Sequence, residues 1–299
     1  PWQVVATWWV LLGPATAMTF YDPAYVAIGQ WFRLDDRRRA IASMTLLAGL
    51  SGPIFIPATD ALVQALGWRL ATLVLGVLLG ATGSLAALVI LRDQPRTGLA
   101  RGPSAPPWAT TRAPRFLVFT LGAVLAYGAL EASIIHRVAR FEEAGFAVAS
   151  VSTWAALSGL LTLPGRFILP ALTTRVAGTA VLTAVLLVLA LATAFALDGS
   201  LEWEMAAYFG LFGLVFGAAL PLRAVIMSDW YAGQDYGAIM GLQAALIAVG
   251  RAAGPPLIGV LRDASTSYQL PMVVVLMALL ASALLILSSG WPRGAASRA

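Results

Sequence analysis

Five charged side chains inside long apolar stretches of this sequence are candidates for chemistry, because few polar groups are available there to solvate them. Three are arginines (Arg166, Arg223 and Arg251) and two are acids (Asp22 and Glu131). A charge at the centre of a bilayer costs about 2.5–3.5 kcal/mol on insertion scales, so such residues line a cavity or pair with each other. These positions are therefore the first candidates for a functional site.

The three arginines are candidates for binding an anionic substrate, because a guanidinium group can hold a carboxylate through two parallel hydrogen bonds. Gln243 and Arg251 share one helix face by their spacing, so Gln243 joins the predicted substrate site. Two alternatives remain open. Arg166 could extend to the lipid headgroups, and Arg223, which follows Pro221, could form a salt bridge between helices.

The two acids, Asp22 and Glu131, are candidates for proton coupling. A carboxyl group removed from water binds a proton more readily, which suits a group that takes up and releases one. Asp22 shares a helix face with Tyr25, and Glu131 follows Tyr127 by one turn. The alternative for both acids is a permanent ion pair with a buried arginine. His136 is a further candidate for carrying a proton, although a lone histidine at a helix end is more often a hydrogen-bonded residue at an interface.

The elements that must position these residues are membrane-spanning helices. Hydrophobic residues make up 60% of the 299 residues and charged residues only 11%, and about 20 apolar residues span a bilayer as a helix. We predict an all-α, polytopic membrane helical bundle with nine spans, at residues 4–32, 40–66, 70–91, 116–138, 147–172, 177–197, 205–230, 236–261 and 268–289.

The residue types that are missing exclude several kinds of chemistry. All 19 basic residues are arginine, so a phosphate loop with its lysine and a lysine Schiff base are excluded. The chain has no cysteine and one histidine, and no His, Asp or Glu pair has the spacing of a metal site or a catalytic pair. We therefore predict no enzyme activity, no catalytic residue, no metal, no cofactor and no nucleic-acid partner.

A polar, arginine-rich segment divides the chain. Residues 92–115 contain five arginines, one acid and five prolines, a composition typical of a flexible linker. We predict an N-terminal helical bundle at 1–91, a cytoplasmic linker at 92–115, a six-helix bundle at 116–290 and a cytoplasmic tail at 291–299. If the linker is cytoplasmic, twelve arginines lie inside and four outside, so the C-terminus is predicted to be cytoplasmic in the cell (inner or plasma) membrane.

Two parts of the chain resemble each other, which indicates an internal repeat of six helices. An Ala-Ile pair, a Gly-Pro pair expected to break the following helix, and then an aspartate occur in the order Ala40-Ile41, Gly52-Pro53, Asp60, and again as Ala238-Ile239, Gly254-Pro255, Asp263. The repeat leaves the helices of 116–197 without counterparts. We therefore expect two six-helix halves, with three helices absent before Pro1.

Several motifs resemble those of major facilitator transporters, in the bacterial branch near the monocarboxylate and oxalate–formate carriers. They are Tyr21-Asp-Pro-Ala24, Arg37-Arg-Arg-Ala40, Gly49-Leu-Ser-Gly-Pro53, Leu66-Gly-Trp-Arg69, Leu163-Pro-Gly-Arg166, Pro170-Ala-Leu-Thr-Thr-Arg175, Asp235-Tyr-Gly-Ala-Ile239 and Gly250-Arg-Ala-Ala-Gly-Pro-Pro256. The resemblance implies that the nine helices correspond to helices four to twelve of a twelve-helix fold.

The resemblance also implies roles for single residues, with two departures. Arg166 matches the arginine that binds the substrate carboxylate in monocarboxylate carriers. Thr162 stands where those carriers have an aspartate one turn earlier, and Thr174 stands where the family has the aspartate of its gating motif. The first departure puts the usual proton-coupling group of the family in doubt.

These patterns predict a secondary active transporter that moves a small organic anion, a carboxylate, by alternating access, driven by protons or by exchange. Its expected partners are the anion, protons and the lipid bilayer, and we expect a monomer. One alternative is proton-driven efflux of lipophilic or cationic compounds with Asp22 and Glu131 as the essential charges. An alternative from another class is a membrane sensor, or a non-functional remnant, with a transporter fold.

Overall fold

The computed structural model describes residues 2–32, 34–89, 107–231 and 236–290, and within these ranges every regular element is a helix. Eight helical stretches are long and apolar enough to cross a membrane. One of them, Asp36–Val89, has 54 residues. At about 1.5 Å per residue it is far longer than a bilayer core of about 30 Å, so it accounts for two of the nine expected spans. The protein is a multi-pass helical membrane protein.

The chain forms two compact units, one made of Pro1–Thr45 with Arg101–Ala299 and the other of Leu46–Ala100. The smaller unit is dominated by α5 (Ser51–Val89), whose two arms meet at Gly67. Gly67 has φ 73° and ψ 159°, a backbone conformation that residues with a Cβ rarely adopt. The predicted turn between the second and third spans lies at this residue. The predicted domain boundaries at 91 and 115 stay predictions.

The first predicted span is interrupted in the structure. It consists of α1 (Trp2–Ala6), a π-helix η1 (Thr7–Leu12), α2 (Gly13–Thr19) and α3 (Tyr21–Trp31). The break is at Phe20, whose backbone is extended with ψ −165°. Pro23 is the third residue of α3, where its missing N–H breaks no helical hydrogen bond. The interruption places Asp22 in the first turn of a new helix.

The second and seventh predicted spans are also broken. The second begins as α4 (Leu34–Gly49), which is separated from α5 by Leu50. The seventh is divided into α10 (Glu202–Phe216) and α11 (Ala219–Tyr231) by Gly217 and Ala218. Arg223 therefore belongs to a separate helix that starts only four residues earlier.

The other predicted spans correspond to single helices. They are α7 (Pro114–Glu143), α8 (Val148–Leu172), α9 (Gly178–Asp198), α12 (Tyr236–Ser265) and α13 (Gln269–Gly290). A short helix, α6 (Pro107–Thr111), lies within the predicted linker. In the repeat, the expected break at Gly254-Pro255 was wrong, because α12 continues through it.

One predicted loop is helical. The charged segment 140–145 was expected to connect two spans, but α7 continues to Glu143. Arg140 explains the extension, because its guanidinium donates to the backbone oxygens of Ala196 (2.8 Å), Leu197 (3.0 Å) and Asp198. These are carbonyls at the C-terminal end of α9, where a cation is favoured. Arg140 therefore attaches the end of α7 to the end of α9.

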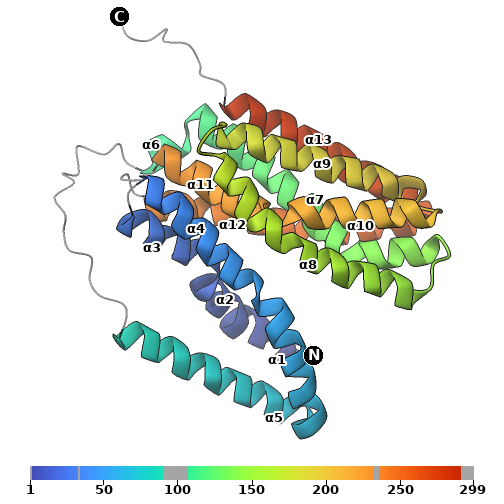
Figure 1. Ribbon diagram of the computed structural model, residues 1–299, viewed down its shortest axis with the longest axis horizontal. Helices are drawn as coiled ribbons and strands as arrows, with labels where there is room; N and C mark the ends of the chain where they lie inside the picture. Colours follow the sequence, from blue (N-terminus) through green and yellow to red (C-terminus); the bar gives the residue numbers. More distant parts are fainter. Residues whose placement is uncertain (1, 33, 90–106, 232–235, 291–299) are drawn as a thin grey trace, which may run out of the picture. The chain divides into compact units, whose positions relative to one another are not determined.

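The helices of residues 107–290 pack closely around aromatic and aliphatic side chains. Helix α13 lies beside α9 and α7, α12 lies beside α7, and α10 lies beside α8 (Figure 1). Glycines allow the closest approaches. A Cβ at Gly254 would lie 2.2 Å from the Gly128 carbonyl oxygen on α7, and one at Gly217 would lie 2.2 Å from the Thr162 oxygen on α8.

Some sequence predictions lie outside the described residues. They include residues 92–106 of the predicted linker, the predicted tail at 291–299, and Asp235 of the family-like motif.

Candidate functional site

Asp22 and Arg223 form an ion pair between α3 and α11. Only 2% of the Arg223 side chain is exposed, compared with 30% of Asp22. The guanidinium also donates to Oε1 of Gln243 on α12 at 3.2 Å, and the Gln243 amide donates to Thr120 on α7 at 3.4 Å. A buried guanidinium is tolerated only with such partners. The network joins four helices and contains three of the six predicted site residues.

Glu131 and Arg251 form a second ion pair, between α7 and α12. Nε and Nη2 of Arg251 each lie 2.9 Å from Oε2 of Glu131. This pair is more exposed than the first, with 41% of the arginine and 30% of the glutamate accessible. The contact of Gly250 and Gly254 with the backbone of α7 brings the two helices close enough for the pair to form. Each predicted acid is thus paired with a predicted arginine.

Arg166 differs from the other two arginines because no carboxylate of the described residues pairs with it. On α8, its Nη1 donates to the Tyr21 hydroxyl at 3.1 Å and to the Thr45 carbonyl at 3.3 Å. Its Nε is buried without a hydrogen-bond partner. The hydroxyl of Thr162, one turn earlier, donates to the Gly159 carbonyl oxygen at 2.7 Å. Arg166 therefore keeps a positive charge that the neighbouring residues do not neutralise.

Three tyrosines surround the Asp22–Arg223 pair. Tyr25, Tyr127 and Tyr236 interact electrostatically with Arg223, and the buried hydroxyls of Tyr25 and Tyr236 have no hydrogen-bond partner among the described residues. A buried unsatisfied polar group costs about 1–3 kcal/mol, so these hydroxyls are candidate donors to a ligand or to water. The sequence indicated Tyr25 and Tyr127 by their helical spacing from the acids. Tyr236 and Tyr21, the partner of Arg166, lie within the family-like motifs, but the sequence gave neither of them a role at the site.

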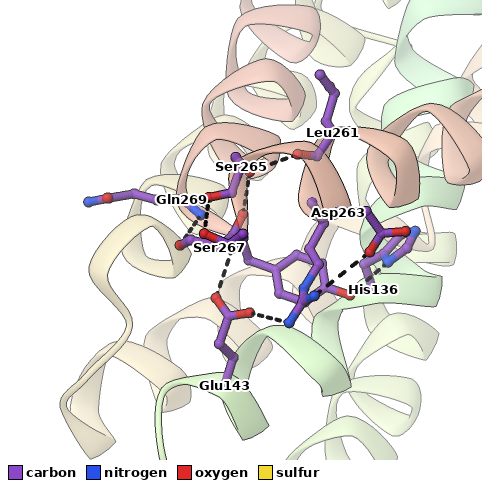
Figure 2. A network of polar contacts seen from close by, with 10 residues as sticks. His136, Glu143, Leu261, Asp263, Ser265, Ser267 and Gln269 are labelled. Carbon is purple, nitrogen blue, oxygen red and sulfur yellow. Dashed lines mark hydrogen bonds and ion pairs between the residues drawn. The ribbon is translucent and has the colours of Figure 1, made fainter.

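A further polar network joins α7, α12 and the start of α13 (Figure 2). His136 lies 3.1 Å from the Tyr268 hydroxyl and 3.0 Å from the Pro255 carbonyl oxygen. Glu143 accepts the Tyr268 backbone N–H at 2.8 Å and pairs with Arg262 at 3.3 Å. The geometry agrees with the interpretation of His136 as a hydrogen-bonded residue at a helix interface.

The hydrogen-bond directions in this network follow from the groups present. A carbonyl only accepts, so Nε2 of His136 carries a proton, and in the neutral ring Nδ1 accepts from the Tyr268 hydroxyl. Burial raises the pKa of the Tyr268 hydroxyl, and the nearby Arg262 charge opposes this shift. The hydroxyl therefore remains a donor at neutral pH, and the network holds the ends of three helices together.

Among the described residues, no group of three His, Cys, Asp or Glu side chains could hold a metal ion. The charged residues that the structure brings together are instead two arginine–carboxylate pairs and Arg166. Such a set can bind an anion and can exchange protons with it.

The comparison with known proteins points to transport. No family model matches the chain. The chain is 27% identical over 294 residues to Monocarboxylate transporter 13 of Bos taurus, a similarity that covers 94% of this chain and 65% of that protein. The chain thus spans 65% of the length of this relative. The similarity supports a distant relationship to transporters of the major facilitator type. The bacterial branch stays a prediction.

Proposed function

We propose that the protein is a secondary transporter that moves a small organic carboxylate across the membrane by alternating access. The observation that carries this proposal is the charge of Arg166. Arg223 and Arg251 are each paired with a carboxylate, whereas Arg166 is not. Among the five charged residues of the predicted site, one positive charge, that of Arg166, is therefore in excess, and one monocarboxylate anion would neutralise it.

The surroundings of Arg166 favour a substrate role. Its present partners are a tyrosine hydroxyl and a backbone carbonyl, on α3 and α4. A carboxylate is a stronger acceptor than either, because its hydrogen bonds with a guanidinium are charge-assisted. An incoming anion would displace them and loosen α8 from α3 and α4. Substrate binding would thereby be coupled to helix movement, as alternating access requires.

The two ion pairs supply a route for proton coupling. When Glu131 takes up a proton, its O–H bond forms, its negative charge is lost and Arg251 is released to attract an anion. One proton and one anion then enter together without net charge. Asp22 and Arg223 could act in the same way. The accessible Glu131–Arg251 pair is the stronger candidate, because Arg223 is almost wholly buried. Gln243 then holds Arg223 in position.

The organisation of the whole protein is part of the proposal. The halves at 1–91 and 116–290 would move about the linker at 92–115, in a monomer of the cell membrane with a cytoplasmic C-terminus. The excess of arginines on the linker side supports this orientation.

Transport assays in proteoliposomes test the function. The full chain should take up radiolabelled lactate, used as a monocarboxylate probe, faster when the outside is acidic. Arg166→Gln should reduce uptake about tenfold or more, the loss of one charge-assisted contact. Arg69→Gln is the matched control, because Arg69 forms no ion pair among the described residues and its guanidinium lies over the Trp68 ring, 4.6 Å from the ring centroid.

The variants also separate the alternatives. Glu131→Gln should retain lactate exchange and lose the stimulation by a proton gradient. Uptake by Arg166→Gln equal to that of the unmodified chain would contradict the proposal. Extrusion of ethidium that survives both Arg166→Gln and Arg251→Gln would point to cation efflux, and lactate binding without any uptake would point to a sensor.

A further inference from the structure

A cavity of about 410 Å³ lies at one end of the helices of residues 107–290, apart from the residues of the proposed transport site. Three arginines line it: Arg38 at the start of α4, Arg115 at the start of α7, and Arg175 between α8 and α9. Asp229, near the end of α11, is the one acid in the lining. The cavity falls within the size range of small-molecule sites, roughly 300–1,000 Å³.

The positive charge of the cavity is only partly neutralised. Arg38 pairs with Asp229 at 2.7 Å and donates to the Thr173 carbonyl at 2.9 Å. Arg115 stacks on the Trp230 ring, 3.8 Å from its centroid, and forms no ion pair with a described residue. Arg175 likewise has no carboxylate partner within the described ranges. Two guanidinium groups in one cavity therefore lack a counter-charge.

The arrangement of donors matches an oxyanion with several oxygens. Each guanidinium presents a planar set of N–H groups that fits phosphate as well as carboxylate. Backbone donors supplement them, because α9 begins at Gly178 after Ala177, whose side chain cannot cap the helix. Apolar groups, including Ile226 and the Trp230 ring, form the rest of the wall. The cavity thus has a polar side that suits an anionic group and an apolar side that suits the organic part of the molecule that carries this group.

We propose that this cavity binds a phosphate monoester, with Arg115 and Arg175 as its charged contacts. A phosphate monoester carries up to two negative charges, which matches the two uncompensated guanidinium groups. The phosphate could belong to an anionic lipid headgroup, since basic pockets between membrane helices on the cytoplasmic side hold such groups. It could equally belong to a free phosphate compound. The proposal does not depend on the transport function, because none of the transport-site residues lines the cavity.

Phosphate binding would affect one contact between helices. Arg38 connects α4 to α8 through Thr173 and to α11 through Asp229. A phosphate in the cavity would compete with Asp229 for Arg38, so the bound ligand would weaken this connection.

Binding measurements on the purified full chain test the proposal with two probes that share the same chemistry. Native mass spectrometry measures the retention of phosphatidic acid, with diacylglycerol as the lipid that lacks phosphate. Calorimetry measures inorganic phosphate. The double variant Arg115→Gln/Arg175→Gln should bind about tenfold more weakly or worse. The matched control, Arg69→Gln/Arg112→Gln, removes the same charge from residues that do not line the cavity.

A second variant keeps the test independent of any folding defect. Asp229→Asn removes the acid that competes for Arg38, so it should strengthen phosphate binding by roughly threefold. If retention of phosphatidic acid falls in the double variant and rises in Asp229→Asn, the result supports a lipid as the source of the phosphate. If inorganic phosphate binds and phosphatidic acid does not, the result supports a free phosphate compound. Equal binding by the unmodified chain and the double variant, or no binding of either probe, would overturn the proposal.

Discussion

Arg223 and Arg251 each face a carboxylate, whereas Arg166 faces a hydroxyl and a backbone carbonyl. Three chemically identical side chains therefore have different partners in the same bundle. A paired guanidinium can attract an anion only after its acid is protonated. Arg166 can do so directly, and it is the residue on which the proposed function depends.

The Asp22–Arg223 pair gives a prediction about stability. Asp22→Asn leaves the buried Arg223 without its acid, which should lower the free energy of unfolding by about 3–5 kcal/mol. The double variant Asp22→Asn/Arg223→Gln should recover a large part of this loss, because the buried charge is then gone. Unfolding of the purified protein in mixed detergent micelles measures both. A double variant as unstable as the sum of its single changes would show that the pair is not coupled.

The sequence identified the charged residues but could not say how they pair. An insertion cost applies to any buried charge, so Asp22, Glu131 and the three arginines were all detectable from the sequence. Asp22 and Arg223 are 201 positions apart, and they become partners only in the folded chain, where α3 packs on α12 and α12 contacts α11. Tyr236 and Tyr21 were not assigned to the site, because a tyrosine in an apolar stretch is equally typical of the core or of the membrane interface.

At the scale of elements, close backbone contacts determine where the charged residues meet. Four pairs of glycines in the sequence have the four-residue spacing that is typical of packing contacts between membrane helices: Gly76/Gly80, Gly213/Gly217, Gly237/Gly241 and Gly250/Gly254. Within the described residues, a Cβ at either glycine of the Gly213/Gly217 or Gly250/Gly254 pair would come within 3 Å of a neighbouring helix. The spacing alone cannot distinguish these pairs from the others, because it does not say which face of a helix is covered.

The contact between α7 and α12 gives a second prediction. Gly254→Ala would place a Cβ 2.2 Å from the Gly128 carbonyl oxygen, so the helices must separate, at a cost of about 1–3 kcal/mol. Gly241→Ala on the same helix meets nothing within 4 Å and should be neutral, or stabilising by about 0.5–1 kcal/mol. Thermal unfolding in detergent compares the two. Equal melting temperatures would contradict the importance of this contact.

Helix boundaries were predicted well where an apolar run ends at a polar turn, as for α8, α9 and α13. They were predicted poorly where a distant contact decides. Arg140 extends α7 because the carbonyls at the end of α9 are there to receive its guanidinium. The break between α10 and α11 likewise accompanies the contact of Gly217 with α8. Neither contact can be read from the local pattern of residues.

At the scale of the whole molecule, the orientation in the membrane can be tested cleanly because the chain has no cysteine. Single cysteines at Ser200, between α9 and α10, and at Thr174, between α8 and α9, occupy exposed positions at opposite ends of α9. With a cytoplasmic linker, Ser200→Cys should react with an impermeant maleimide in intact cells. Thr174→Cys should react only after permeabilisation. The reverse pattern would contradict the proposed orientation.

Arg166 is proposed to bind a carboxylate, and a direct binding measurement tests this role without requiring transport. Calorimetric titration of the purified chain with lactate should show saturable binding. Arg166→Gln should weaken this binding about tenfold or more, the loss of one charge-assisted hydrogen bond. The control Arg69→Gln should bind as the unmodified chain does. Equal affinity of Arg166→Gln and the unmodified chain would show that the unpaired charge of Arg166 has another purpose.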